Sequence, residues 1–205
     1  MQVSILQWNV WYKEDIQNIA AFLKACPADI ICLQELTQGY QETEPDTIEH
    51  IARALGYRYY GQGMPLPGNS WVQANAIFTR FPLVSKSFQY INEPIGTNGF
   101  DDEYRSYVEV TLQIDDTHQL TVGTTHMSYT DRFASTPRKE QEADKLTAIL
   151  RTKQQNFTFT GDLNAAPDST TVNKVSAILR NAGPAMSENT WTTKPFSYMA
   201  LRRLN

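Results

Sequence analysis

Four short apolar segments of this chain each run directly into a polar side chain, and this pattern restricts the folds that are open to it. The segments lead into Asn9, into Glu35, into His126, and into the pair Asp162 and Asn164. Short apolar runs are typical of buried strands, and ligands of α/β sheets bind beyond the carboxyl ends of the strands. We therefore expect four neighbouring strands whose polar ends converge on one cleft.

The residue types at these four ends suit one kind of chemistry. Glu35 and Asp162 offer the hard oxygen ligands that Mg²⁺ or Mn²⁺ prefer. Asn9 and Asn164 can orient a nucleophile or a carboxylate without adding charge, and His126 can donate to a phosphoryl oxygen or transfer a proton. A metal that polarises a phosphoryl oxygen and an aspartate that orients water are sufficient for phosphoester hydrolysis.

Each of these residues also has a purely structural interpretation. Asn9 could cap a turn, and Glu35 could be an exposed residue at a strand end. His126 could be a hydrogen-bonded core histidine, while Asp162 and Asn164 could form an Asx-turn before the next helix. Four such coincidences at four strand ends are rarer than any single one, which favours a functional site.

The rest of the chain has a mixed α and β pattern, with no repeat and no linker. Amphipathic spacing and end signals predict helices over residues 15–26, 47–55, 137–150 and 170–181. Strands are expected over 3–8, 30–34, 57–60, 75–79, 84–90, 104–114, 120–125 and 157–160, with a loop over 61–69. Many strands with few helices between them indicate stacked sheets that are flanked by helices.

Composition excludes several classes of protein. With 205 residues, 41% of them hydrophobic and 20% charged, the chain suits one soluble domain. No segment approaches the roughly 20 apolar residues of a membrane span, and the first residues do not resemble a signal peptide. Cys26 and Cys32 have no metal-binding or redox spacing, so we expect reduced thiols and a cytoplasmic location. The net charge of −4 argues against a broad basic surface for nucleic acid.

The apolar segments and their polar ends also carry a resemblance to a known family. The strings ILQWNV, IICLQEL, NAIFTRFP, TTHMSY and FTGDLNAAP occur in this order. Together they resemble the endonuclease/exonuclease/phosphatase superfamily, which includes exonuclease III-type repair nucleases, pancreatic-type deoxyribonuclease and neutral sphingomyelinases. The string GDLNA after an apolar strand is the most specific motif. The resemblance runs from Met1 to the region of Trp191.

The resemblance implies an α+β fold, a four-layer sandwich in which two mixed β-sheets pack face to face with helices outside. It implies Mg²⁺ or Mn²⁺ as the cofactor, with Glu35 as the metal-binding glutamate and Asn9 as the residue that supports it in holding the metal. It further implies that Asp162 orients and deprotonates the attacking water. Asn164 would steady the phosphate and the metal shell, and His126 would contact the phosphate.

Further residues are candidates for substrate binding. Arg105 resembles an arginine near the scissile phosphate in some branches of the family, although a solvated strand-end arginine is the alternative. Tyr129, soon after His126, is a second candidate. The basic residues that follow could contact substrate or could equally lie in a solvated helix start; they are Arg132, Arg138 and Lys139. Two tryptophans, Trp11 and Trp71, could stack on a ligand or belong to the core.

The sequence departs from the family pattern at its end. The family normally finishes with a basic-x-Asp-Tyr-type strand and a Ser-Asp-His motif, and this chain has neither; residues 197–205 read SYMALRRLN. We expect one domain over 1–205, truncated after the region of residue 198 and lacking its last strands. Loss of one base in a related coding sequence would produce such an ending, which reading the downstream genomic DNA would test. The domain would then be less stable than a full-length relative, or would self-associate through an exposed sheet edge.

These observations favour a metal-dependent phosphoester hydrolase of the phosphodiesterase or nuclease type, with chemistry weakened or lost by the truncation. Its partner would be a phosphoester substrate such as a nucleic acid or a nucleotide. Two alternatives stay open: a phosphomonoesterase acting on an inositol phosphate or a nucleotide, and a non-catalytic module that binds phosphate ligands. The sequence does not name the substrate.

Overall fold

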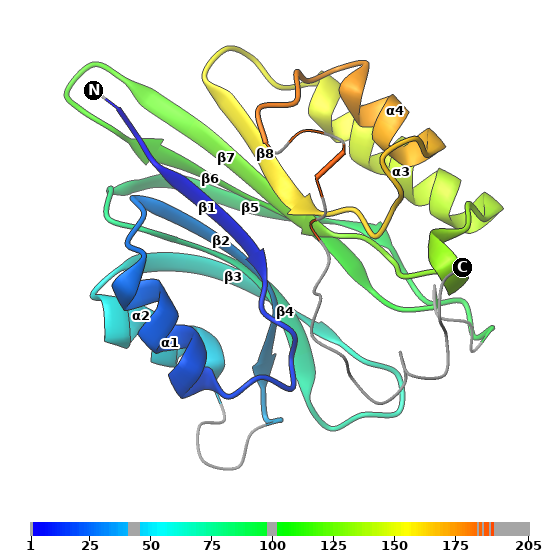
Figure 1. Ribbon diagram of the computed structural model, residues 1–205, viewed down its shortest axis with the longest axis horizontal. Helices are drawn as coiled ribbons and strands as arrows, with labels where there is room; N and C mark the ends of the chain where they lie inside the picture. Colours follow the sequence, from blue (N-terminus) through cyan, green and yellow to red (C-terminus); the bar gives the residue numbers. More distant parts are fainter. Residues whose placement is uncertain are drawn as a thin grey trace.

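The computed structural model describes residues 2–40, 46–97, 102–183, 185, 187, 188 and 190. These residues form four layers, with two four-stranded sheets in the middle and helices on both outer faces (Figure 1). The predicted sandwich of two mixed sheets with helices outside is confirmed. No helix in the described ranges is long and apolar enough to cross a membrane.

Each sheet contains one parallel pair of strands among antiparallel neighbours. The first sheet has the order β1 (Ile5–Asn9), β2 (Ile30–Gln38), β4 (Val72–Thr79) and β3 (Arg58–Pro65), with β1 and β2 parallel. The second has the order β5 (Leu83–Asn92), β6 (Arg105–Gln113), β7 (Gln119–His126) and β8 (Phe157–Asp162), with β7 and β8 parallel. Among the described residues, β1 and β8 therefore form the outer strands of their sheets.

The helices lie on the outer faces, each beginning at a capping side chain. On the first sheet lie α1 (Ile16–Ala25) and α2 (Thr47–Leu55), and on the second lie α3 (Pro137–Arg151) and α4 (Thr170–Ser176) (Figure 1). A short 3₁₀ turn, η1 (Asp131–Phe133), precedes α3. Side-chain oxygens of Asp15, Asp46, Thr136 and Ser169 accept a first-turn backbone N–H of α1, α2, α3 and α4, respectively.

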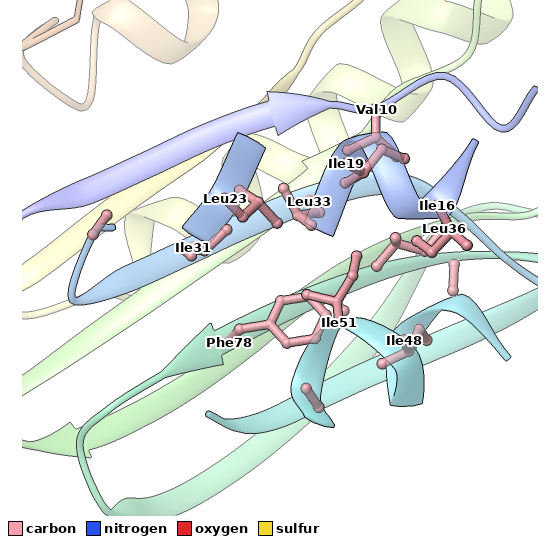
Figure 2. Packing of buried hydrophobic residues seen from close by; sticks show 14 residues of the cluster. Val10, Ile16, Ile19, Leu23, Ile31, Leu33, Leu36, Ile48, Ile51 and Phe78 are labelled. Atoms are coloured by element: carbon pink, nitrogen blue, oxygen red, sulfur yellow. The ribbon is translucent and has the colours of Figure 1, made fainter. Parts of the chain in front are cut away.

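Three apolar cores hold the four layers together. Strand β2 shows the principle, because Ile31 and Leu33 face the α1/α2 layer while Ile30 and Cys32 face the second sheet. Figure 2 shows the first of these cores, where side chains of α1 and α2 meet those of β2 and β4, among them Leu23. Burial raises the pKa of the Cys32 thiol to about 12, which keeps it protonated and unreactive.

Most predicted elements are present, but the extents of three are wrong, one of which, β2, is described with the site below. Strand β3 continues to Pro65, although residues 61–69 were expected to form a loop. Gly61 lies so close to β4 that a Cβ atom would be 3.0 Å from the Cβ of Ala76, so this glycine permits pairing where it resembled a loop residue. The last helix ends at Ser176, shorter than the predicted 170–181.

The predicted truncation concerns residues 197–205, which lie outside the described residues. The truncation, the single-domain boundary and the proposed frameshift therefore stay predictions.

Candidate active site

The two parallel strand pairs meet at the same edge of the sandwich and bring the predicted side chains together. Strand β1 lies against β8, and β2 contacts both β7 and β8 (Figure 1). Asn9, His126 and Asp162 are the last residues of β1, β7 and β8, respectively. The predicted convergence of the strand ends is therefore what the structure shows.

Asn9 links the two carboxylates of the site. Its Nδ2 atom donates to Glu35 Oε1 at 2.8 Å and to Asp162 Oδ2 at 2.9 Å. Its Oδ1 atom accepts the backbone N–H of Trp11 at 3.0 Å, which fixes the amide in this orientation. The second oxygen of Glu35 accepts the backbone N–H of Tyr12 at 3.1 Å. The sequence left two alternatives for Asn9, a turn cap or a functional residue. Asn9 does both, because its oxygen caps the turn at Trp11 and its nitrogen contacts the two carboxylates.

Glu35 lies within β2 rather than at its end, because the strand passes through a bulge. Leu33 pairs with Ala76 and Leu36 with Ala74, so two residues of β2 oppose one residue of β4. Glu35 has a positive φ of 63°, which is uncommon for a residue other than glycine. β-bulges re-aim side chains near active sites. The bulge accounts for a strand that was expected to stop at residue 34 and instead continues to Gln38.

The turn after β8 places Asp162 and Asn164. Gly161 has a φ of 149° and lies so close to Thr125 that a Cβ atom would be 2.5 Å from its carbonyl oxygen, so only glycine fits before Asp162. Asp162 Oδ1 accepts the backbone N–H of Asn164 at 2.8 Å, and Asn164 has a φ of 45°. Asp162 and Asn164 therefore form the Asx-turn that was the purely structural interpretation. The same turn also positions both side chains at the site.

His126 lies at the centre of the cluster and is 4% exposed. Arg105 Nη1 lies 3.1 Å from its Nδ1 atom and Asn164 Nδ2 lies 2.9 Å from its Nε2 atom. The Nε2 atom is also 3.8 Å from Glu35 Oε1 and 4.0 Å from Asp162 Oδ2. Burial lowers the pKa of His126, and the nearby Arg105 charge lowers it further, against the opposing effect of the two carboxylates. The ring is therefore neutral at pH 7.

A neutral imidazole has one acceptor nitrogen, yet two donor groups face this ring. The Arg105 guanidinium can only donate, and the Asn164 amide group also donates to the carbonyl oxygen of Met127 at 2.9 Å. One of the two contacts with His126 therefore lacks an acceptor. Arg105 Nε is buried and has no hydrogen-bond partner among the described residues, which adds a further donor without an acceptor.

Arg105 is buried rather than solvated, so the strand-end alternative does not describe it. It is 5% exposed, and its Nη2 atom forms an ion pair with Glu103 Oε2 at 2.6 Å. Tyr129 follows β7 and its ring lies 5.6 Å from that of Phe133, so it contacts η1. Glu103 was not recognised from the sequence; its position two residues before Arg105 is the only local signal for this pair.

The basic residues before and within α3 have three different environments. Arg132 is exposed, and Arg138 donates to Asn92 Oδ1 at 3.2 Å and to the carbonyl oxygen of Glu93. Lys139 is only 1% exposed, so neither the solvated nor the substrate-contacting interpretation fits it. Glu142, also buried, accepts the backbone N–H of Ser128 at 3.0 Å and was missed in the sequence.

The two tryptophans also differ. Trp71 is stacked on Tyr12 with ring centroids 5.4 Å apart and lies 4.7 Å from the ring of Tyr40. Trp71 is only half-buried and is not a member of the three apolar cores found among the described residues, so it belongs to an aromatic cluster with Tyr12 and Tyr40 rather than to the core. Trp11 is 41% exposed beside Asn9.

The donor set of the site fits a weakly held divalent metal. Among the described residues there is no group of three or more histidine, cysteine or acidic side chains that could hold an ion. Two carboxylates, Glu35 and Asp162, are joined through one amide. Mg²⁺ typically binds through one or two carboxylates and completes its shell with water and substrate phosphate. Such a site needs no third acidic ligand.

Two surface hollows open around residues 150–157, at the other end of β7 and β8, and none of the predicted site residues lines them. Their linings include Lys153, which pairs with Glu109 at 2.6 Å. The candidate site is therefore separate from these hollows. It lies at the carboxyl ends of the parallel strands, where the carboxylate, amide and imidazole side chains converge.

Comparison with solved structures identifies proteins of the same fold. The catalytic domain of human nocturnin, solved with a bound sulfate anion, is 18% identical, with a TM-score of 0.65 over 85% of this chain and 69% of that chain. A mannosyl-6-phosphatase of Bacteroides thetaiotaomicron is 17% identical, with a TM-score of 0.64 over 86% and 70%. ANGEL2, a 2′,3′-cyclic phosphatase, is 19% identical, with a TM-score of 0.66 over 85% and 56%. The chain thus spans little more than half of the ANGEL2 structure.

Comparison with curated protein sequences finds no match. The model of the endonuclease/exonuclease/phosphatase family matches residues 6–202, which is nearly the whole sequence and includes all the site residues described above. On this evidence the chain belongs to the endonuclease/exonuclease/phosphatase family.

Proposed function

We propose that this protein is a metal-dependent phosphoester hydrolase of the phosphodiesterase or nuclease type. The observation that carries the proposal is the imbalance of hydrogen-bonding groups at one site. Arg105 and Asn164 direct donors at a buried, neutral His126 that cannot accept from both. A tetrahedral phosphoryl group brings several strong acceptor oxygens and negative charge, which would satisfy these donors.

Beside these donors lie the groups that would hold a metal and activate water. Glu35 is the proposed metal ligand, and a bound Mg²⁺ or Mn²⁺ would polarise the phosphoryl oxygen and offset developing charge. Asp162 would orient and deprotonate the attacking water, and its contact with Asn9 aims it toward Glu35. Asn9 holds both carboxylates through its amide nitrogen; its predicted role as a metal ligand would require its oxygen, which now accepts from Trp11.

The remaining roles follow from position. With Arg105 donating to Nδ1, the hydrogen of the neutral His126 ring is on Nε2, where it could be donated to a phosphoryl oxygen. Asn164 would contribute a second donor to the same oxygen. Arg105 and Tyr129 are kept as the proposed substrate-binding residues, with Arg105 supplying a buried positive charge.

Two known structures bear on the class of substrate. The similar structures of a mannosyl-6-phosphatase and of a 2′,3′-cyclic phosphatase show that this fold hosts action on both phosphomonoesters and cyclic phosphodiesters. A phosphomonoesterase is therefore the second candidate, and a non-catalytic phosphate-binding module is the third.

The test compares hydrolysis of bis-p-nitrophenyl phosphate with that of p-nitrophenyl phosphate, with Mg²⁺ or EDTA, for the wild type and Asp162→Ala. We expect turnover of the diester that needs the metal and falls by about 10²- to 10⁴-fold in the variant. Faster hydrolysis of the monoester would favour the second candidate. Binding of inorganic phosphate without turnover of either ester would favour the third and contradict the proposal.

Two further proposals concern the protein outside the site. A cytoplasmic location is supported by two free cysteines, one of which, Cys26, is exposed. Self-association through the outer edges of β1 or β8 would be detected as concentration-dependent mass in sedimentation experiments.

A further inference from the structure

Lys139 is a buried charged residue that the proposed chemistry does not use. It belongs to the first turn of α3, where its backbone N–H is capped by Thr136 Oγ1 at 3.1 Å. The side chain is 1% exposed and extends inward instead of into solvent. A buried ammonium group is costly unless several acceptors surround it, so its surroundings indicate what it does.

The ammonium group of Lys139 binds two loops that carry site residues. Its Nζ atom donates to the carbonyl oxygen of Ser128 at 2.6 Å and to the carbonyl oxygen of Asn164. Ser128 lies two residues after His126, and Asn164 lies two residues after Asp162. One side chain therefore joins the backbone that follows β7 to the backbone that follows β8.

The contact with Asn164 acts on a residue whose conformation matters to the site. Asn164 has a left-handed backbone, its N–H donates to Asp162, and its amide side chain donates toward His126. Holding its carbonyl oxygen restricts rotation of the following peptide, which steadies this conformation. Glu142, one helical turn after Lys139, anchors the other loop through the backbone N–H of Ser128.

Helix α3 is a suitable anchor for such contacts. Its apolar residues Ala143, Leu146 and Leu150 are fully buried against the second sheet. Its first turn is thereby held in a fixed position relative to β7 and β8. Positioning side chains are most effective when they extend from rigid elements.

We propose that Lys139 is a positioning residue that sets the relative placement of His126, Asp162 and Asn164. The inference rests on the proposed function for its consequence in catalysis, but its structural part can be tested without activity. Loss of Lys139 would free the Asn164 turn while leaving the sheets and the remainder of α3 in place.

The first experiment measures amide hydrogen exchange in metal-free protein. Lys139→Met keeps an unbranched side chain as far as the Cε atom and removes the Nζ donor. We expect faster exchange at the Asn164 amide, with the central amides of β7, such as that of Val122, unchanged. The matched control is Thr147→Val in the same helix, whose buried hydroxyl donates to the carbonyl oxygens of Ala143 at 2.9 Å and of Asp144 at 3.1 Å within α3. This control should not affect the Asn164 amide.

The second experiment measures kcat and KM for the diester. We expect kcat of Lys139→Met to fall by about 10- to 100-fold, the effect usual for groups that orient ligands, with little change in KM. Lys139→Arg should recover part of the loss, and Thr147→Val should keep the wild-type kcat. If Lys139→Met does not fold, Lys139→Gln replaces it. Glutamine has no charge and is too short to contact both carbonyl oxygens, so the same results are expected.

The outcomes separate the two proposals. Unchanged exchange at Asn164 in Lys139→Met, or a loss of kcat that Thr147→Val reproduces at equal loss of stability, would overturn the positioning role. Absence of hydrolysis in the wild type would overturn the proposed function alone, because the exchange experiment would still decide the role of Lys139.

Discussion

The two helical layers cover their sheets in different ways. The helices α1 and α2 bury almost only apolar side chains, such as Ile19, Leu23 and Ile51. Helix α3 buries apolar residues as well, but its buried face also includes Lys139 and Glu142. Both layers exclude water from a sheet. The charged groups of α3, however, contact the backbone beside the strands that carry the candidate site, so this helix contributes to that site as well as to the core.

The difference teaches that buried polar groups distinguish the helix that contacts the candidate site from the helices that only cover a sheet. A buried charge is a poor source of stability, since its desolvation offsets much of what its partners provide. In α3 the partners of the buried charges are backbone groups of Ser128 and Asn164, next to His126 and Asp162. Changes in the α1/α2 layer should therefore affect stability alone, whereas changes at the start of α3 should affect activity as well.

The largest effect on stability is expected from the apolar layer. Leu23 is fully buried between α1 and the first sheet (Figure 2), and Leu23→Ala should lower the free energy of unfolding by about 2–5 kcal/mol through the cavity it leaves. Urea unfolding measures the loss. The kcat per folded molecule should stay at the wild-type value. A fall in kcat would contradict the view that the α1/α2 layer affects stability alone.

A smaller effect is expected from the helix caps, which offer a matched pair. Asp15→Ala in α1 and Thr136→Ala in α3 each remove one side-chain cap and should each cost about 0.5–2 kcal/mol. Only Thr136 caps the N–H of Lys139, so only its variant should also lower kcat. Thermal unfolding together with diester kinetics checks both, and equal kinetics in the two variants would argue against a special role for the start of α3.

The smallest effect concerns pH. Burial lowers the pKa of His126 in the folded protein below its ordinary value of 6.5, so the unfolded chain takes up a proton first as the pH falls. The stability provided by the neutral ring is thus present above pH 6.5 and is lost progressively below it. Urea unfolding in EDTA from pH 8 to pH 5 should show this decline in the wild type but not in His126→Asn. The control variant His50→Asn in α2 should show the same decline in stability as the wild type. If this variant showed no decline, the pH effect would arise from the α1/α2 layer and not from His126.

Much of the fold and of the site could be predicted because periodicity and residue type are local properties. The continuous apolar run at the start of β2 indicates a buried strand, the spacing in α1 identifies its buried face, and the polar ends of β1, β7 and β8 indicate a shared site. The resemblance to the family contributed the four-layer arrangement. The expected strand end at residue 34 was wrong, since a bulge depends on pairing with β4, and the glycines of β3 were mistaken for a loop because their close neighbour lies in another strand.

By itself the sequence determined the types of side chain at the site and, for Asn9, His126 and Asp162, their positions at the ends of strands, because these follow from the order of residues along each strand. Only the tertiary structure decided what each side chain contacts. Lys139 looks like any exposed residue of a helix start, and Glu103 looks like a surface acid, until the packing of α3 and the burial of Arg105 bring them to their partners. The reason is physical: burial of a charge depends on which distant backbone and side-chain groups surround it, and no local pattern records those neighbours.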